Sequence, residues 1–348
     1  MEMLIGIFVF CIVLFIYLHV MFQIRTSDDL EVYELDDSSK EIMEEICDMR
    51  QPVIFGFDNE EIVKYTSRDY IALNYHAFEV KVRDTNDTED NYACLPLQLS
   101  HAIKLFEEDK TKSYISENNN PFLQETGIIK TLQSNDQFIR PYMVASCEYD
   151  IIMGGDGSIT PLRYNVNYRN YYCATQGNIE IKLIPPRSSK YLTPINDYEN
   201  FEFRSPINAW NVQPSYAGYF DKVKCLEVSL HVGQTIHIPP YWWYSIKFGK
   251  NSSITCFHYR TYMNNVAILP KTIMYLLQNQ NVKREVAKKA QTMPIISAPV
   301  PAAEKGKTSN IPPAPAHISE PVKTSEEDGT NIIELFNRTM ASYSTESA

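Results

Sequence analysis

The stretch TPLRYNVNYRN, residues 160–170, lies in the middle of a region that is dense in short apolar segments. Between residues 140 and 260 these segments are separated by Gly, Pro and Asn, and many short strands at such spacing are typical of an all-β barrel or sandwich. The sequence therefore predicts a mainly β domain built around this stretch. The segments are YDIIMG, YYCAT, IEIKLI, LEVSLHV, QTIHIP, YSIKF and SITCFHY.

Further elements are predicted on both sides of this region. QPVIFGF (51–57) is typical of a buried strand, and YHAFEVKVRDT (75–85) alternates apolar and polar residues as a half-buried strand does. Residues 270–291 predict a helix near the end of the ordered chain. The helix-flanked β domain is expected to span residues 51–262, with a C-terminal helix over residues 263–292.

Two more helices are expected before the dense β region. SSKEIMEEICDM (38–49) places Ile42, Ile46 and Met49 on one face after a serine cap, which predicts a short amphipathic helix. LPLQLSHAIKLFEED (95–109) has a proline near its start and apolar residues on one side, so it also predicts a helix.

The N-terminus carries an apolar run without charge at residues 3–24. At about 1.5 Å per residue, such a helix matches a hydrocarbon core of roughly 30 Å. A cleaved signal peptide would need a basic n-region, but Glu2 precedes the run and no Lys or Arg does. We expect a retained membrane anchor over residues 1–24 and a single-pass protein, followed by an acidic stalk and short helix over residues 25–50.

Charge and cysteine content narrow the class of protein. The net charge is −11 and no long basic run is present, which excludes a general nucleic-acid binder. The seven cysteines form no CxxC pair, which argues against a zinc or redox motif and favours reduced thiols. Arg25 follows the apolar run and no basic residue precedes it, so the bulk of the chain is predicted to face the cytoplasm.

The C-terminal segment changes in composition after Met293. Prolines lie among Ala, Ser, Lys and Glu, which predicts a disordered tail over residues 293–348. Near its end NIIELFNRTM (331–340) gathers five apolar residues. One interpretation is a short helix that docks on a protein partner, and the other is a frayed tail that packs on its own domain.

Several motifs follow one another in a fixed order, and together they resemble the cupin-like branch of the Jumonji (JmjC) oxygenase superfamily, which includes the asparaginyl hydroxylases. The resemblance covers roughly residues 50–262 and implies a double-stranded β-helix, a cupin jelly-roll of two facing sheets with one open mouth. It also implies Fe(II) and 2-oxoglutarate as cofactors. The motifs are QPVIFGF, GGDGSITPLRYN, NYYCATQGNIEIKLIPP, VGQTIHIPPYWWYSIKF and SITCFHY.

The positions where the resemblance implies iron ligands hold other residues. The first His position is Arg163, the Asp position is Asn165 and the second His position is Tyr244, while the Lys that grips 2-oxoglutarate falls at Ile179. A guanidinium offers no lone pair, and an amide and a phenol are weak ligands for Fe(II). We therefore expect no metal site, no catalytic residue and no bound cofactor.

The degenerate site leaves two interpretations of Arg163. It pairs with an acidic side chain and ties the two sheets together, or it forms the centre of an anion pocket for a carboxylate or phosphate. The residues expected to line this pocket are Arg163, Asn165, Tyr244, Thr160, Asn170 and Trp242.

The sequence thus predicts a membrane-anchored, catalytically silent cupin-like domain that acts as a scaffold or partner-binding module. Divergent proteins of this kind resemble those of large DNA viruses, which implies a role at a virion membrane or capsid. A protein partner is expected, with the C-terminal tail as one place for it, and the C-terminal helix offers a surface for a homodimer. The alternatives are an Fe(II)/2-oxoglutarate-dependent protein hydroxylase with atypical ligands and a small-anion sensor.

Overall fold

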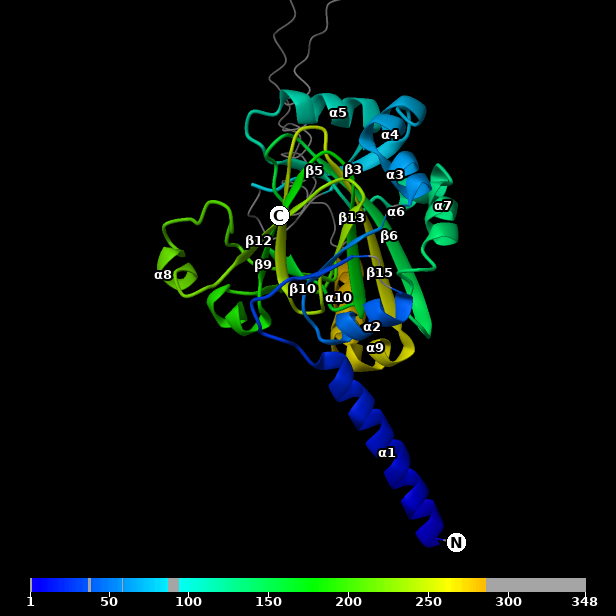
Figure 1. Cartoon of the computed structure of the whole chain (residues 1–348). Helices are drawn as coiled ribbons and strands as arrows, with labels where there is room; N and C mark the ends of the chain where they lie inside the picture. Colours follow the sequence, from blue (N-terminus) through cyan, green and yellow to red (C-terminus); the bar gives the residue numbers. More distant parts are fainter. Residues whose placement is uncertain (1, 37–38, 58, 87–93, 286–348) are drawn as a thin grey trace, which may run out of the picture.

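Two β-sheets face each other in the computed structural model, and a single long helix projects from one end of the domain (Figure 1). The structure describes residues 2–36, 39–57, 59–86 and 94–285. The predicted tail over residues 293–348 and its helix at 331–340 lie outside these ranges. The predicted jelly-roll with flanking helices is confirmed.

The larger sheet has nine strands within the described ranges, and neighbours pair antiparallel except for the parallel pair at its β1 edge. In spatial order they are β1 (Tyr33–Leu35), β2 (Val53–Gly56), β13 (Gln234–His237), β8 (Arg169–Gln176), β15 (Ser253–Thr261), β6 (Val144–Gly154), β5 (Tyr114–Ser116), β3 (Glu79–Asp84) and β4 (Leu95–Gln98).

The smaller sheet has six strands in the same part of the chain, all paired antiparallel. The chain passes from one sheet to the other between β8 and β9 through Gly177, which has a φ of 70°. A Cβ at this glycine would lie 2.9 Å from Ser252 Cα, so the turn requires glycine. The order of strands is β10 (Ile195–Asp197), β11 (Glu202–Arg204), β7 (Arg163–Tyr164), β14 (Trp243–Phe248), β9 (Ile179–Ile184) and β12 (Leu226–Leu230).

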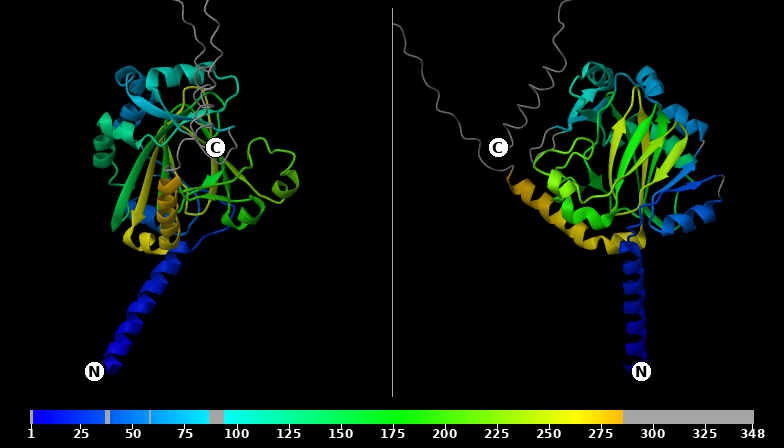
Figure 2. Two further views of the ribbon diagram at one scale, coloured as in Figure 1. Left: turned by 180° about the vertical axis from the view of Figure 1, so that it is seen from behind. Right: turned by 60° about the vertical axis from the view of Figure 1, so that its left-hand side comes forward.

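Helices cover the outer face of the larger sheet, so its central strands are buried on both sides (Figure 2). On β8, Tyr171 and Cys173 face the helices, whereas Tyr172 and Ala174 face the smaller sheet. The helices before the barrel are α2 (Lys40–Asp48), α3 (Glu60–Thr66), α4 (Arg68–Asn74), α5 (Leu99–Glu108), α6 (Asn120–Glu125) and α7 (Ile128–Asn135); η1 (Pro186–Tyr191), α8 (Ala217–Phe220), α9 (Tyr262–Ala267) and α10 (Leu269–Glu285) follow.

Each of the nine strand segments expected from the sequence forms a strand, but details of the flanking elements differ. Pro96 lies in β4 and the helix begins only at Leu99, because residues 95–98 pair with β3. Part of the predicted stalk, Tyr33–Leu35, pairs with β2 as an edge strand. The C-terminal helix is divided into α9 and α10.

The predicted amphipathic helix is present as α2, but its predicted apolar face is only partly covered, with Ile46 packed against the core. The helix forms after its serine cap, but Met43 and Cys47 are its buried residues. Ile42 is 50% exposed and Met49 is 41% exposed. The side of α2 that faces the barrel instead carries Glu44, which binds Arg169 on β8.

The projecting helix α1 (Glu2–Ile24) is long and apolar enough to cross a membrane, on length and composition alone. Its segment Met3–Ile24 has a mean hydropathy of 2.8 over its most apolar window, and none of that window is buried in the protein. A signal sequence meets the same test.

A fully buried histidine lies on β13 of the larger sheet. Burial is the main cause that lowers the pKa of His237, and the Arg169 and Arg50 guanidiniums lower it further, so this pKa lies well below its usual value. The unfolded chain therefore takes up a proton near pH 6.5 that the folded chain does not. The stabilisation is complete above pH 6.5 and is lost as the pH falls.

We expect the free energy of unfolding to decrease below pH 6.5, by up to about 1.4 kcal/mol per pH unit for each such histidine. His237→Phe removes the titrating ring and should make this decrease shallower in urea titrations of the full chain in detergent micelles. The matched control is His76→Phe, because His76 is exposed. Equal pH slopes for the wild type and His237→Phe would contradict the prediction.

Candidate functional site

The three positions expected to hold iron ligands meet in one cavity between the sheets. Arg163 on β7 pairs directly with Tyr244 on β14, so their side chains lie next to each other. Asn165 lies just after the end of β7, and its side chain faces the same cavity. All three line a cavity of about 150 Å³.

Arg163 is held by two carboxylates. Its Nη2 donates to Glu117 Oε2 at 2.7 Å, and its Nη1 donates to Glu202 Oε1 at 3.2 Å. The same carboxylates bind a second guanidinium, since Arg83 Nε lies 2.7 Å from Glu117 Oε1 and Arg83 Nη2 donates to Glu202 Oε1 at 3.2 Å. Two guanidiniums and two carboxylates thus form a closed ring, which we call the ion-pair ring (Arg83, Glu117, Arg163 and Glu202).

The ion-pair ring connects the two sheets. Arg83 lies on β3 and Glu117 directly follows β5 in the larger sheet, whereas Arg163 lies on β7 and Glu202 on β11 in the smaller sheet. The sequence left open whether Arg163 forms a structural network or an anion pocket, and the geometry is that of the network.

The ring is shielded from solvent. The side chains of Arg83 and Glu117 are 2% and 1% exposed, and those of Arg163 and Glu202 are 11% and 14% exposed. Burial alone would raise the pKa of Glu202, but the Arg83 and Arg163 guanidiniums outweigh burial and lower that pKa to about 2. Burial would lower the pKa of Arg163, but Glu117 and its other neighbours hold it well above its usual value. Glu202 and Arg163 are therefore both charged at neutral pH.

The amide and the phenol form a second group of contacts beside the ring. Asn165 Nδ2 donates to the hydroxyl of Tyr172 at 2.8 Å and to that of Tyr244 at 3.2 Å. The Arg163 guanidinium lies 5.8 Å from the centre of the Tyr244 ring. Burial raises the pKa of Tyr244, so the phenol stays protonated.

These residues do not fit a ferrous ion. A guanidinium stands at one ligand position and is already bound by two carboxylates, and the Asn165 amide presents its N–H groups to the phenols. Ile179, at the position implied for the 2-oxoglutarate lysine, is fully buried in the apolar core between the sheets. Within the ranges that the structure describes, no group of three or more His, Cys, Asp or Glu side chains could hold a metal.

The opposite wall of the cavity adds further carboxylates. Glu148 and Asp150 on β6 line it, together with His258 on β15. Burial raises the pKa of Asp150 to about 7, although backbone N–H groups of Asn119 and Asn118 oppose this. Burial, with Arg163, lowers the pKa of His258 to about 3, so its ring is neutral. A cavity that disfavours its own carboxylate charge is a poor site for an anion.

The remaining predicted pocket residues lie elsewhere. Asn170 is buried and its Nδ2 donates to the carbonyls of Asn167 and Ile238. Trp242 is fully buried and its Nε1 donates to the carbonyl of Arg50 at 3.1 Å. Both residues lie outside the cavity that contains Arg163.

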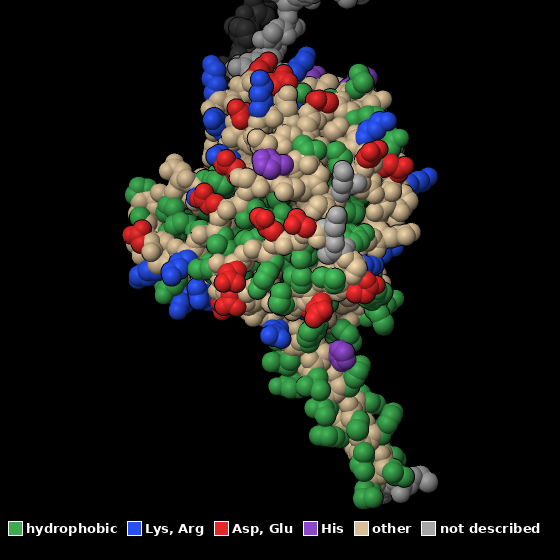
Figure 3. Space-filling model, viewed as in Figure 1, with side chains coloured by type: hydrophobic (Ala, Val, Ile, Leu, Met, Phe, Trp, Pro, Cys, Tyr) green, Lys and Arg blue, Asp and Glu red, His purple; other side chains and the backbone are tan. Residues whose placement is uncertain are grey.

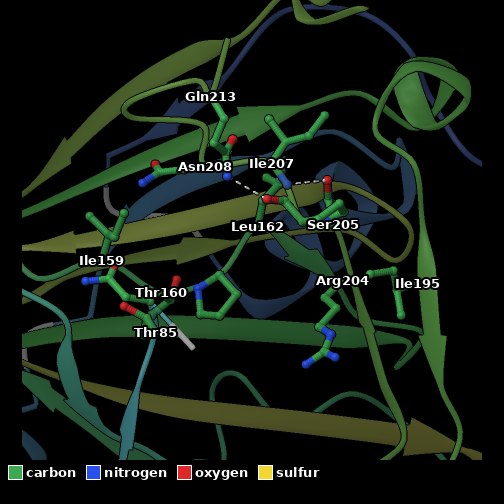
Figure 4. A pocket seen from close by; sticks show the side chains of 13 residues that line it. Thr85, Ile159, Thr160, Leu162, Ile195, Arg204, Ser205, Ile207, Asn208 and Gln213 are labelled. Carbon is green, nitrogen blue, oxygen red and sulfur yellow. Dashed lines mark hydrogen bonds between the residues drawn. The ribbon is translucent and has the colours of Figure 1, made fainter. Parts of the chain in front are cut away.

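Thr160 lines a separate cavity of about 110 Å³ (Figure 4). Its Oγ1 accepts a hydrogen bond from the backbone N–H of Ile246, which fixes the Thr-Pro turn on β14. The labelled side chains of this second cavity come from the segment before β7, from β10 and β11, and from the segment after β11, while Thr85 follows β3. They combine hydroxyl, amide and guanidinium groups with Ile159, Leu162 and Ile207.

Sequence reasoning missed three members of the ion-pair ring. Arg83, Glu117 and Glu202 lie 80, 46 and 39 residues from Arg163 along the chain and belong to no motif, so no local pattern indicates that they meet. The available signal was Arg163 itself, since a guanidinium in a barrel interior requires carboxylate partners.

Comparison with known proteins supports the same relationship as the motifs. A family model described as a cupin-like domain matches residues 39–265. The JmjC domain-containing protein D of Dictyostelium discoideum is 30% identical over 100 residues, which are 29% of this chain and 22% of that protein. The match thus covers about a fifth of the length of that relative.

We expect Arg163→Met to lower the free energy of unfolding by about 3–5 kcal/mol, because it leaves buried carboxylates without their partner. The exposed pair Lys247–Glu180 has the same 2.7 Å separation, and Lys247→Met should cost less than about 1 kcal/mol. Urea titration of both variants measures the difference.

The double variant Arg163→Met/Glu117→Gln restores charge balance in the ring, so it should lose less stability than the two single variants added together. If Arg163→Met costs no more than Lys247→Met, the ion-pair ring does not stabilise the barrel.

Proposed function

Because the chain belongs to the cupin-like domain family, we propose that it is a membrane-anchored member without catalytic activity that serves as a scaffold or partner-binding module. One observation carries this proposal. Arg163 stands where the JmjC-related motif has an iron-binding histidine, and Glu117 and Glu202 hold its guanidinium in place. An Fe(II)-dependent hydroxylase needs electron-pair donors at that position.

The ion-pair ring gives the former metal position a structural role. In a metal-dependent barrel the ion gathers ligands from different strands, and here Glu117 and Glu202 are gathered by two guanidiniums instead. The charges of the two guanidiniums and the two carboxylates balance one another without a bound ion. This arrangement supports a barrel that presents a fixed surface to other molecules and that needs no cofactor.

Membrane anchoring is supported by α1 and by the thiols. The most apolar window of the helix is not buried by the domain. All seven cysteines are free, which suits a domain that faces the cytoplasm. The charged cavity argues against the small-anion sensor, because Glu117 and Glu202 already neutralise the two guanidiniums and Glu148 adds a further carboxylate. The C-terminal tail over residues 293–348 is a candidate segment for binding a protein partner.

We expect the full chain, purified in detergent and incubated with Fe(II), to retain far less than one equivalent of iron. With 2-oxoglutarate and oxygen it should form no succinate above a protein-free control. Elemental analysis and succinate detection by mass spectrometry check both points. One equivalent of iron that is lost in Asn165→Ala, together with succinate formation, would show that the chain is an oxygenase with atypical ligands.

A further inference from the structure

We propose that the end of the domain around the root of α1 rests on a lipid bilayer of zwitterionic headgroups. We call this region the basal surface, and it consists of α2, the loop before β6 and α9. The proposal rests on the membrane anchoring proposed above and adds to it a defined orientation of the barrel. The exposed apolar side chains of the basal surface are Ile42, Met49, Tyr142, Met143, Tyr262 and Val266.

The C-terminal end of α1, which we call its root, is fixed to the domain. The helix and the barrel are therefore not joined by a flexible linker. Arg50 is 1% exposed, and its Nη2 donates to the carbonyl of Phe22 in the last turn of α1 at 3.3 Å. The guanidinium also lies 5.2 Å from the centre of the Phe22 ring and 5.0 Å from that of Tyr168 on the edge of β8. This contact satisfies a helix-terminal carbonyl and places a cation at the negative end of the helix dipole.

Two further contacts reinforce the same junction. Gln51 Nε2 donates to Ser27 Oγ at 3.3 Å and to Asp29 Oδ2 at 3.0 Å, which holds the chain immediately after α1. Helix α9 contacts α1 directly. If α1 crosses a bilayer, the surface around its root is therefore held at the level of the headgroups.

The basal surface is continuous around α1. Lys40, the first residue of α2, donates to the carbonyls of Gln137 and Arg140 and lies 5.1 Å from the ring of Tyr142. At the other end of this loop, Val144 pairs with Thr261, the residue before α9. Figure 1 shows α2 and α9 side by side at the end of the domain from which α1 leaves, and Figure 3 shows hydrophobic side chains gathered in this region.

Within the described part of the chain, no other element covers the exposed apolar side chains of the basal surface. Ile42 and Met49 form the apolar face that predicted an amphipathic α2, and they are 50% and 41% exposed. Tyr142 and Tyr262 are 64% and 61% exposed. Tyrosine is enriched where a protein meets the bilayer interface, because its ring enters the apolar region while its hydroxyl stays hydrated.

The charges near the root of α1 select the kind of lipid. The carboxylates of Asp29, Glu41 and Glu45 are exposed there, against the exposed Arg25 and the partly exposed Lys40, while Arg140 is paired with Asp136. An excess of carboxylates is repelled by anionic headgroups. The basal surface therefore fits a bilayer of phosphatidylcholine better than one that contains phosphatidylserine.

Photo-crosslinking of the full chain in phosphatidylcholine vesicles tests this placement. A photo-reactive p-benzoylphenylalanine replaces one residue at a time, either Tyr142, Tyr262, Tyr219 or Phe10, and mass spectrometry identifies the adducts. Tyr219 on α8 is the matched control, because it is 58% exposed and α8 lies away from the root of α1 (Figure 1). Phe10 in α1 reports on the span itself.

We expect lipid adducts at positions 10, 142 and 262 and none above background at 219. Adducts at position 10 without adducts at 142 and 262 would overturn the basal contact but leave the anchor intact. The absence of adducts at position 10 would overturn the anchor. Chain-to-chain adducts at 142 and 262 would show that a second copy covers the basal surface, which also overturns the proposal.

Vesicles that contain phosphatidylserine test the choice of lipid. The adduct yield at positions 142 and 262, relative to that at position 10, should decrease in these vesicles. An equal or higher relative yield would contradict the preference for zwitterionic headgroups.

Discussion

A buried charge must be matched by a partner, and in this barrel four charged groups match one another. Glu117 is 1% exposed, and both of its oxygens lie 2.7 Å from a guanidinium nitrogen. Burying a carboxylate at this depth costs free energy unless it is paired, and Arg83 and Arg163 supply the partners of both carboxylates in the ion-pair ring. The four residues come from β3, the end of β5, β7 and β11, so the ring also fixes how the two sheets face each other at this end of the barrel.

The fold could be predicted from the sequence because its signals are local. The stretch YYCA (171–174) of β8 is continuously apolar and aromatic because both of its faces are covered. The start of β3 alternates because Glu79 and Lys81 are exposed on one face. That Arg163 pairs with an acidic side chain and ties the sheets together was one of two interpretations of the sequence. Its partners in the ion-pair ring could not be predicted, because they meet only through the topology of the sheets. How far the apolar face of α2 is buried could not be predicted for a related reason. Periodicity shows that a helix has an apolar side, but it does not show whether that side faces the barrel or another apolar environment.

Three successive residues in the motif that begins at Trp242 make different contacts. Trp242 lies in the core between the sheets and donates to the carbonyl of Arg50, the residue that holds the root of α1. Trp243 points to the other face of β14 and its Nε1 donates to Ser189 Oγ at 2.7 Å. Tyr244 enters the cavity beside Arg163. A short continuous stretch thus connects the helix root, the outer face of the smaller sheet and the former ligand position.

At the positions where the resemblance implies metal ligands, this barrel has an ion-pair ring, so its folding need not depend on a bound metal ion. A metal site contributes to folding only when the ion is bound, because its ligands repel one another or remain unsatisfied without it. The ion-pair ring contributes whenever the chain is folded, since Glu202 remains ionised down to a pH of about 2. A domain held in this way keeps one arrangement of its sheets whatever the supply of iron or keto acid. For the membrane-anchored scaffold that we propose, whose surface would have to stay constant while its partners vary, such independence is the property that matters.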